Sequence, residues 1–192
     1  MLSVVIATQA SERALVPTLA ALVPGAVAGV VREVIVTDAG AGDASAQIAE
    51  GAGCRVMTSS DSRGARLSAA ARVARAPWLL FLQPGTVPDA TWIDETSRFI
   101  EEAELGNRAD GHAAVFRRRS SSFRPTVVEA MTLLHAAVLA RPGADQGLLI
   151  AKSLYDRLGG HRADLDEPER DLLRRLGRRR TVLLRAGVLT PR

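Results

Sequence analysis

Aromatic residues, cysteine and lysine are scarce in this sequence. Aromatic residues make up 4% of the 192 residues and apolar residues 47%, so alanine, valine and leucine must fill the core. Lys152 is the one lysine, and Cys54 is the one cysteine, which excludes an intramolecular disulfide and a cysteine metal cluster. The three histidines show no metal-ligand spacing, so we expect no zinc site.

Long apolar runs are absent as well. None reaches the roughly 18 residues that a membrane-spanning helix needs. The first residues, "MLSVVIATQ", lack the basic segment and the length of a secretory signal. We therefore expect a cytoplasmic protein, and contact with the inner face of a membrane stays open.

The excess of positive charge is small and uneven. The net charge is +4, from 25 basic and 21 acidic residues, and much of the excess lies in the arginine-rich segments 116–124 and 174–185. Such segments can meet phosphates, acidic headgroups or nucleic acid. Neither is interleaved with the aromatic residues that stack on bases, and Tyr155 is the one tyrosine. We expect no nucleic-acid partner.

Short apolar runs alternate with segments of helical spacing in the first half of the chain. Ser11 is a candidate N-cap of the first helix, and Pro24-Gly25 is predicted to end it. This order predicts an α/β fold with a mostly parallel central sheet flanked by helices. The predicted strands are 2–8, 32–40, 54–59 and 77–85, and the predicted helices are 11–25, 43–53 and 63–76.

Polar residues follow the predicted strands where each strand ends. Thr8, Asp38 and the segment from Gln83 to Thr86 occupy these positions. Ligands of open α/β sheets bind beyond the carboxyl ends of the strands. A binding site at this edge therefore follows from the pattern alone.

The segment "VIVTDAGAGDAS" around Asp38 has three interpretations. A dinucleotide fingerprint needs glycine or alanine six positions into the motif, and Ser45 stands there. A simple turn capped by Asp43 is the second interpretation. The third is a nucleotide site in which the Asp38 carboxylate accepts hydrogen bonds from a base or ribose.

Five segments, taken in order, carry a resemblance to a known family. They are "SVVIAT", "EVIVTDAGAGDAS", "SSDSRGARLSAAARVARAPWLLFLQPGT", "DQGLLIAKSLYDRLGGH" and "ERDLLRRLGR". The chain resembles the family 2 glycosyltransferases of GT-A fold, in particular a short bacterial branch. The resemblance implies one GT-A domain over residues 1–192, with a nucleotide-binding half over about 1–100 and an acceptor-side half over about 101–192.

The activity implied by the resemblance is transfer of a sugar from a nucleotide-diphosphate sugar to an acceptor hydroxyl, with inversion. Asp38 would bind the base or ribose at the strand end shared with Thr8, and Asp43 would shape the adjoining turn. Arg63 and Gly64 match an Arg-Gly pair that lies near the diphosphate. A guanidinium group also suits phosphate on chemical grounds, although a solvated loop arginine is an equal alternative.

The metal-binding motif of the family is degenerate here. Gln83-Pro84-Gly85-Thr86 stands where the wider family has Asp-x-Asp, which holds Mn²⁺ or Mg²⁺ on the diphosphate. A hard cation needs oxygen ligands, preferably charged ones, and Gly85 supplies no side chain. Asp89 is the nearest carboxylate that could replace them. These residues disfavour the Mn²⁺ or Mg²⁺ that the resemblance implies, and we assign no metal ligand.

The acceptor side is better preserved. Asp145 and Gln146 match an Asp-Gln-Gly motif that borders the acceptor pocket, and Asp166 takes the position of the general base. A carboxylate at this point is also a good helix cap, and that interpretation stays open for Asp166.

The resemblance leaves one alternative function and several partners open. The alternative is a catalytically inactive relative that serves as a nucleotide-binding or assembly module. The acceptor is unknown, and lipid-linked acceptors are common in the family. Apolar residues at helical spacing over 127–138 predict a buried helix that takes part in a homodimer contact, with membrane docking as the less favoured outcome.

Overall fold

A computed structural model describes residues 1–106, 111–119 and 143–190, and these residues form one eight-stranded sheet covered by helices. The predicted strand–helix alternation of the first half is confirmed. In order, the elements are β1 (Leu2–Thr8), α1 (Glu12–Val27), β2 (Val31–Asp38), α2 (Ser45–Gly51), β3 (Arg55–Thr58), α3 (Arg63–Val73), β4 (Trp78–Leu82), β5 (Val87–Pro88), α4 (Trp92–Leu105), β6 (Ala113–Arg119), η1 (Ala144–Gln146), β7 (Leu148–Ala151), α6 (Lys152–Arg157), α7 (Pro168–Leu176), η2 (Arg178–Arg180) and β8 (Thr181–Leu189).

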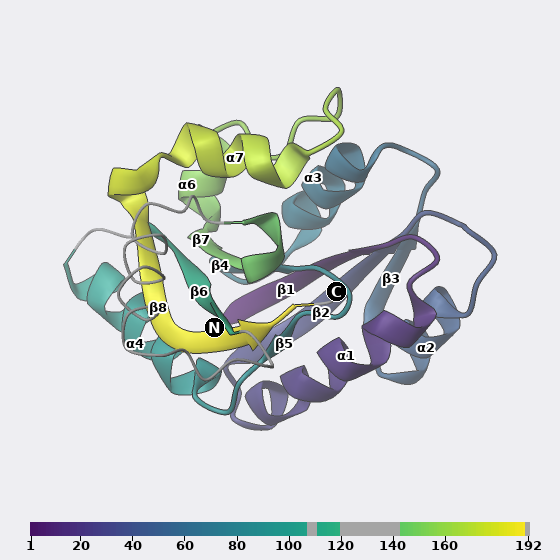
Figure 1. Cartoon of the computed structure of the whole chain (residues 1–192), viewed down its shortest axis with the longest axis horizontal. Helices are drawn as coiled ribbons and strands as arrows, with labels where there is room; N and C mark the ends of the chain where they lie inside the picture. The colour runs from purple at the N-terminus through teal and green to yellow at the C-terminus, as the bar shows by residue number, and fades with distance from the viewer. Residues whose placement is uncertain (107–110, 120–142, 191–192) are drawn as a thin grey trace, which may run out of the picture.

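The strand order is β3-β2-β1-β4-β7-β6-β8-β5. The first four strands of this order are parallel, whereas β7 runs antiparallel to both β4 and β6. Figure 1 shows α3, α6 and α7 above the sheet and α1 and α2 below it. The carboxyl ends of β1, β2 and β4 therefore meet at one edge, as the sequence predicts.

The strands are apolar because both faces of the sheet are covered. Every residue of β1 and β4 is buried, and so is every residue of β7. Continuous apolar runs are what a parallel strand between two helical layers requires. Trp78 at the start of β4 packs edge-on against Phe99 of α4, with ring centroids 5.8 Å apart.

The prediction that Pro24-Gly25 ends the first helix is wrong. Helix α1 continues to Val27 and ends where Gly29 adopts a φ of +71°. Gly25 lies inside the helix and packs against Trp92, and the position has room for glycine alone because a Cβ there would come within 2.5 Å of the Trp92 ring. The Trp92 indole also donates to the Ala21 carbonyl at 3.2 Å. Packing against this tryptophan outweighs the local preference of the proline to end the helix.

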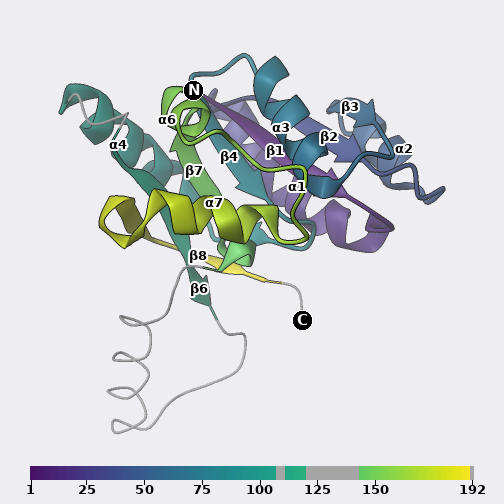
Figure 2. The ribbon, with the colours of Figure 1, turned by 90° about the horizontal axis from the view of Figure 1, so that it is seen from above.

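The segment between α6 and α7 runs beside α3 before it turns back into α7 (Figure 2). The Ser62 hydroxyl at the start of α3 donates to the Ala163 carbonyl at 2.7 Å and accepts from the Ala65 amide. This contact places the start of α7 at the carboxyl edge of the sheet.

Two expectations concern the membrane. Within residues 1–106, 111–119 and 143–190, no helix combines the length and the apolar character that crossing a membrane requires. The helix predicted over 127–138, with its homodimer or membrane contact, lies outside the described residues.

Candidate functional site

Thr8 and Asp38 meet at the ends of β1 and β2. The Thr8 hydroxyl donates to Asp38 Oδ1 at 2.8 Å, and the Gly40 amide donates to Oδ2 at 2.8 Å. Both carboxylate oxygens are thus bonded within the protein, and Asp38 is 4% exposed. Asp38 is not among the residues that line the cleft described below. Nucleotide binding by Thr8 and Asp38 remains a prediction.

Arg66 braces the same strand ends, and the sequence analysis missed it. Its Nη1 donates at 2.8 Å to the carbonyls of both Thr8 and Thr37, which join the ends of β1 and β2. Arg66 is 3% exposed, and its Nε is buried without a partner. Burial and then the charge of Arg63 lower the pKa of Arg66, whereas the charge of Asp38 raises it. The available signal was an arginine in the first turn of α3, next to the buried Leu67 and one turn before the buried Ala70.

Asp43 organises the loop after β2. Its carboxylate accepts from the Ser45 hydroxyl at 2.6 Å, from the Ser45 amide at 3.3 Å and from the Glu12 amide at 3.2 Å. Hydrogen bonds, that from the Ser45 hydroxyl foremost, lower the pKa of Asp43. The predicted turn at Asp43 is therefore present, but the N-cap position of α2 belongs to Ala44 and not to Asp43. The Asp43 carboxylate instead accepts from the first amide of α1. Ser11 precedes α1 without a side-chain capping bond.

Arg63 begins α3 at the edge of a cleft. Its Nε donates to Glu169 Oε1 at 2.7 Å, and its Nη1 donates to the Ala7 carbonyl at 3.1 Å. Gly64, beside it, is packed so closely that a Cβ would lie 1.9 Å from the Arg162 carbonyl oxygen. The glycine is therefore explained by the approach of the segment before α7. Binding of a diphosphate by Arg63 and Gly64 remains a prediction.

The segment Gln83-Pro84-Gly85-Thr86 is a tight turn at the end of β4. The Thr86 amide donates to the Gln83 carbonyl at 3.0 Å, and Gly85 has a φ of +87°. Proline followed by glycine with positive φ makes a type II turn. The Gly85 amide donates to the Thr18 hydroxyl at 2.8 Å, so the turn is fixed onto α1.

Asp145 and Gln146 lie in η1, next to this turn. The Thr86 hydroxyl donates to the Asp145 carbonyl at 3.3 Å, and Arg118 Nη2 donates to both Asp145 carboxylate oxygens at 2.5 Å. Gln146 is used structurally: it accepts from the Gly143 amide and donates to the Phe116 carbonyl. The acceptor role of Asp145 and Gln146 remains a prediction.

An open cleft of about 1230 Å³ separates these groups from α7. Arg63 and Gln83 line one side, Gly143 to Asp145 another, and α7 with the residues before it a third. Asp166 lines the cleft two residues before α7 begins. Glu167 holds the N-cap position of α7, so the interpretation of Asp166 as the helix cap is wrong.

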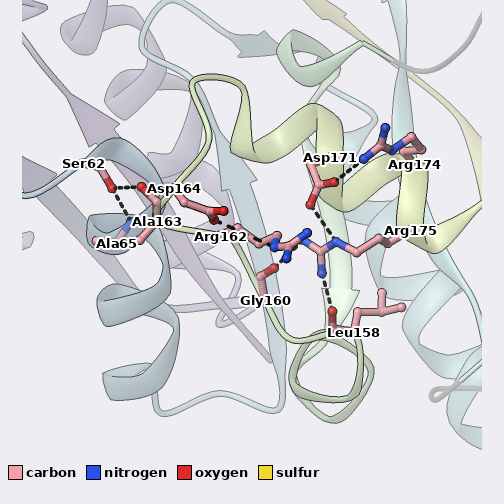
Figure 3. A network of polar contacts seen from close by, with 10 residues as sticks. All are labelled: Ser62, Ala65, Leu158, Gly160, Arg162, Ala163, Asp164, Asp171, Arg174 and Arg175. Atoms are coloured by element: carbon pink, nitrogen blue, oxygen red, sulfur yellow. Dashed lines mark hydrogen bonds and ion pairs between the residues drawn. The ribbon is translucent and has the colours of Figure 1, made fainter.

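Contacts between arginines and the buried Asp171 hold α7 in place (Figure 3). Arg175 Nε donates to Asp171 Oδ2 at 2.7 Å, and the other nitrogens of Arg175 donate to the carbonyls of Leu158 and Gly160. Arg174 donates to the second Asp171 oxygen at 2.9 Å. Asp171 is 7% exposed, so this network anchors one wall of the cleft from inside.

His161 is buried next to the cleft. Its Nδ1 lies 2.9 Å from the Tyr155 hydroxyl, and its amide donates to the same hydroxyl oxygen at 3.0 Å. Because the hydroxyl oxygen already accepts from the amide, its proton is free to point to Nδ1, which suits a neutral imidazole. The Nε2 atom is buried without a partner, and the residue borders a cavity of about 10 Å³ with Gln83 and Glu169.

The residues at the β4 turn do not fit a divalent cation. As ligands for a cation, Gln83 offers only a neutral side-chain amide and Gly85 has no side chain. The Thr86 hydroxyl is already hydrogen-bonded to the Asp145 carbonyl in η1. Asp89 cannot replace them, contrary to the alternative raised above, because its carboxylate accepts from Thr91, from the Gly187 amide at 2.8 Å and from Arg119 at 3.1 Å. Among the described residues, no three histidine, cysteine, aspartate or glutamate side chains gather around one point.

Comparison with solved structures identifies the architecture. The chain superposes over its full length on S. aureus TarS 1-349 in complex with UDP-GlcNAc, with a TM-score of 0.71 and 16% identity. The chain has the GT-A fold. Mannosyltransferase PcManGT from Pyrobaculum calidifontis, in complex with GDP-Man and Mn²⁺, matches 98% of the chain at a TM-score of 0.75 and 13% identity.

A third GT-A neighbour is glucosyl-3-phosphoglycerate synthase from Mycobacterium tuberculosis, in complex with Mn²⁺, UDP and glucosyl-3-phosphoglycerate. It matches the full chain at a TM-score of 0.71 and 17% identity, over 72% of its own length. The chain spans 59% of the TarS chain and 56% of PcManGT. No protein-family model matches the chain, and no curated protein matches it significantly. These likenesses confirm the predicted GT-A fold.

Proposed function

We propose that the chain is a glycosyltransferase that moves a sugar from a nucleotide-diphosphate donor to an acceptor hydroxyl, with inversion at the sugar carbon. The GT-A fold supports the reaction class. The observation that carries the proposal to this chain is the state of Asp166, an exposed carboxylate on the wall of the 1230 Å³ cleft.

The other carboxylates of the cleft wall are already paired. Glu169 pairs with Arg63 at 2.7 Å and Glu167 with Arg170 at 2.9 Å. Asp171 pairs with two arginines, the nearer at 2.7 Å, and Asp145 pairs with Arg118 at 2.5 Å. Within the described part of the chain, Asp166 alone among these cleft carboxylates has no hydrogen bond or ion pair. It is therefore the carboxylate that can accept a proton without first breaking a contact.

The chemistry follows from this placement. The acceptor hydroxyl would lie between Asp166 and the donor, whose diphosphate faces Arg63. As the acceptor oxygen forms its bond to the sugar carbon, Asp166 takes the hydroxyl proton and the bond from the carbon to the diphosphate breaks. The nucleoside diphosphate leaves from the face opposite to attack, which inverts the configuration.

The test uses release of UDP or GDP from a panel of nucleotide sugars with candidate acceptors. Asp166→Asn should lower turnover by about 10²–10⁴-fold, because it removes the base and keeps the shape of the side chain. Asp164→Asn is the matched control: its side chain is 73% exposed, its ion pair with Arg162 is long at 3.9 Å, and it does not line the cleft. Unchanged turnover in Asp166→Asn would contradict the assignment.

A second function is supported by the β4 turn. Gln83 and Gly85 carry no charged oxygen, which favours a nucleotide-binding module without transfer. Binding of UDP or GDP by calorimetry, with no turnover of any nucleotide sugar in the panel, is the result expected of such a module.

A further inference from the structure

Two arginines lie near the β4 turn, where a cation would be expected in a GT-A enzyme, and within the described part of the chain each has N–H groups without a partner. Arg63 lines the cleft on the α3 side, whereas Arg118 does not line it and is connected to it through its ion pair with Asp145 of η1. Their positions matter because the turn between them, Gln83 to Thr86, supplies no ligand that fits a metal. A diphosphate placed at this turn would still need positive charge.

Arg63 is oriented and partly free. Glu169 holds its Nε and the Ala7 carbonyl holds its Nη1, at 2.7 Å and 3.1 Å. Its Nη2 has no partner among the described residues, and its side chain is 29% exposed. The guanidinium is therefore fixed at the end of β1 with one nitrogen available to a ligand.

Arg118 is oriented in a similar way from the other side. Among the described residues, only the Asp145 carboxylate engages Arg118, at its Nη2, and the Arg118 side chain is 56% exposed. The Thr86 hydroxyl ties Asp145 to the β4 turn. Gly143 leaves room for the pair, because a Cβ there would lie 2.3 Å from Asp145 Oδ1 and 2.9 Å from Arg118 Nη2.

Two carboxylates near the β4 turn hold arginines. Asp145 orients Arg118, and Asp89 accepts from Arg119 at 3.1 Å. Binding a cation at either carboxylate would require breaking an ion pair. The charge of each guanidinium group is partly compensated by its carboxylate partner, and the planar N–H pairs of both groups match phosphate oxygens.

We propose that this chain binds the diphosphate of its donor through the guanidinium groups of Arg63 and Arg118, without a divalent cation. The inference rests on the proposed function, since the ligand is the donor nucleotide of that reaction. It assigns Arg118 to the donor site, and it makes the ion pair with Asp145 a positioning contact.

Calorimetric titration with UDP and GDP tests the proposal on the full chain, first in EDTA and then in Mn²⁺. The dissociation constant in EDTA should lie within about threefold of that in Mn²⁺. Arg118→Gln and Arg63→Gln should each weaken binding about tenfold or more, because each removes charge-assisted hydrogen bonds. Arg98→Gln is the control, since Arg98 pairs with Glu95 and Glu102 of its own helix, and neither of these carboxylates lines the cleft.

The outcomes separate the two proposals. Nucleotide binding that appears only with Mn²⁺ would overturn the arginine site and leave the proposed transferase intact. Failure of UDP and GDP to bind in either condition would contradict the proposed function itself, because the reaction needs a nucleotide donor. If Arg63→Gln or Arg118→Gln melts early, Arg63→Lys and Arg118→Lys keep the charge and lose the planar fork. Full affinity in both lysine variants and in the glutamine variants would contradict the proposal.

Discussion

Mild acid should destabilise this protein through one buried histidine. His161 is 4% exposed, and its ring packs edge-on against Phe81 with centroids 4.7 Å apart. Burial, followed by the positive charges of Arg175 and Arg63, lowers the pKa of His161 to about 3. The pKa of a histidine in an unfolded chain is about 6.5.

The direction of the effect follows from these two values. Well above pH 6.5 the imidazole is neutral in the folded and the unfolded state, so it does not change the folding stability with pH. As the pH falls from 6.5 towards 3, the unfolded chain binds a proton that the folded protein does not, so folding stability falls. Relative to pH 7.5, the loss is about 1.3 kcal/mol at pH 5.5 and about 2.7 kcal/mol at pH 4.5.

Urea unfolding at pH 7.5 and pH 5.5 measures this loss, with the buried Trp78 and Trp92 as fluorescent reporters. The pH window lies above the range in which carboxylates titrate. His161→Phe removes the titrating ring, so the wild-type protein should lose about 1.3 kcal/mol more than this variant between the two pH values. His112→Gln, a change at a half-buried histidine before β6, is the control. Equal losses in the wild type and in His161→Phe would refute the assignment of a neutral, buried His161.

Two further predictions concern the walls of the cleft, and urea unfolding tests both. Gly64→Ala should destabilise the protein by about 1–3 kcal/mol, because the new Cβ would meet the Arg162 carbonyl oxygen at 1.9 Å, whereas Gly51→Ala meets nothing and should be neutral or slightly stabilising. Arg175→Gln should cost about 2–3 kcal/mol through its contacts with Asp171 and two carbonyls. Arg174→Gln, at a side chain 75% exposed, should cost about 0.5 kcal/mol or less. Equal losses within either pair would contradict the reasoning.

The parts of the fold that depend on local pattern were predictable from the sequence. The apolar runs of β1, β2 and β4 are continuous because helices cover both faces of the sheet, and a continuous apolar run can be recognised in the sequence alone. The ends of these strands meet because parallel strands share a carboxyl edge, so Thr8, Asp38 and Gln83 could be placed at one edge without coordinates.

The parts that depend on distant contacts were not predictable. Pro24 strongly favours the end of a helix, yet α1 continues past it. The packing of this part of α1 against Trp92, 68 residues further along the chain, could not be predicted from the local sequence. The sequence indicates no partner for Asp89, whereas in the structure its carboxylate accepts hydrogen bonds from Gly187 and Arg119. The sequence does not distinguish Arg66 from the surface arginines, and its hydrogen bonds to the β1 and β2 carbonyls are evident only in the structure.

The loss of carboxylates at the β4 turn and the rigidity of that turn have one cause. Proline at the second position and glycine at the third are what a type II turn requires, and the Gly85 φ of +87° is a conformation that an aspartate adopts only with strain. The turn then fixes Thr86, whose hydroxyl holds η1, and η1 carries the Asp145 that orients Arg118. A sequence that exchanges metal ligands for this turn therefore also acquires the means to position an arginine beside it. Degeneration of a metal motif would leave Arg118 and Asp145 unrelated to the turn; their connection to it through Thr86 is the structural reason to regard the site as rebuilt.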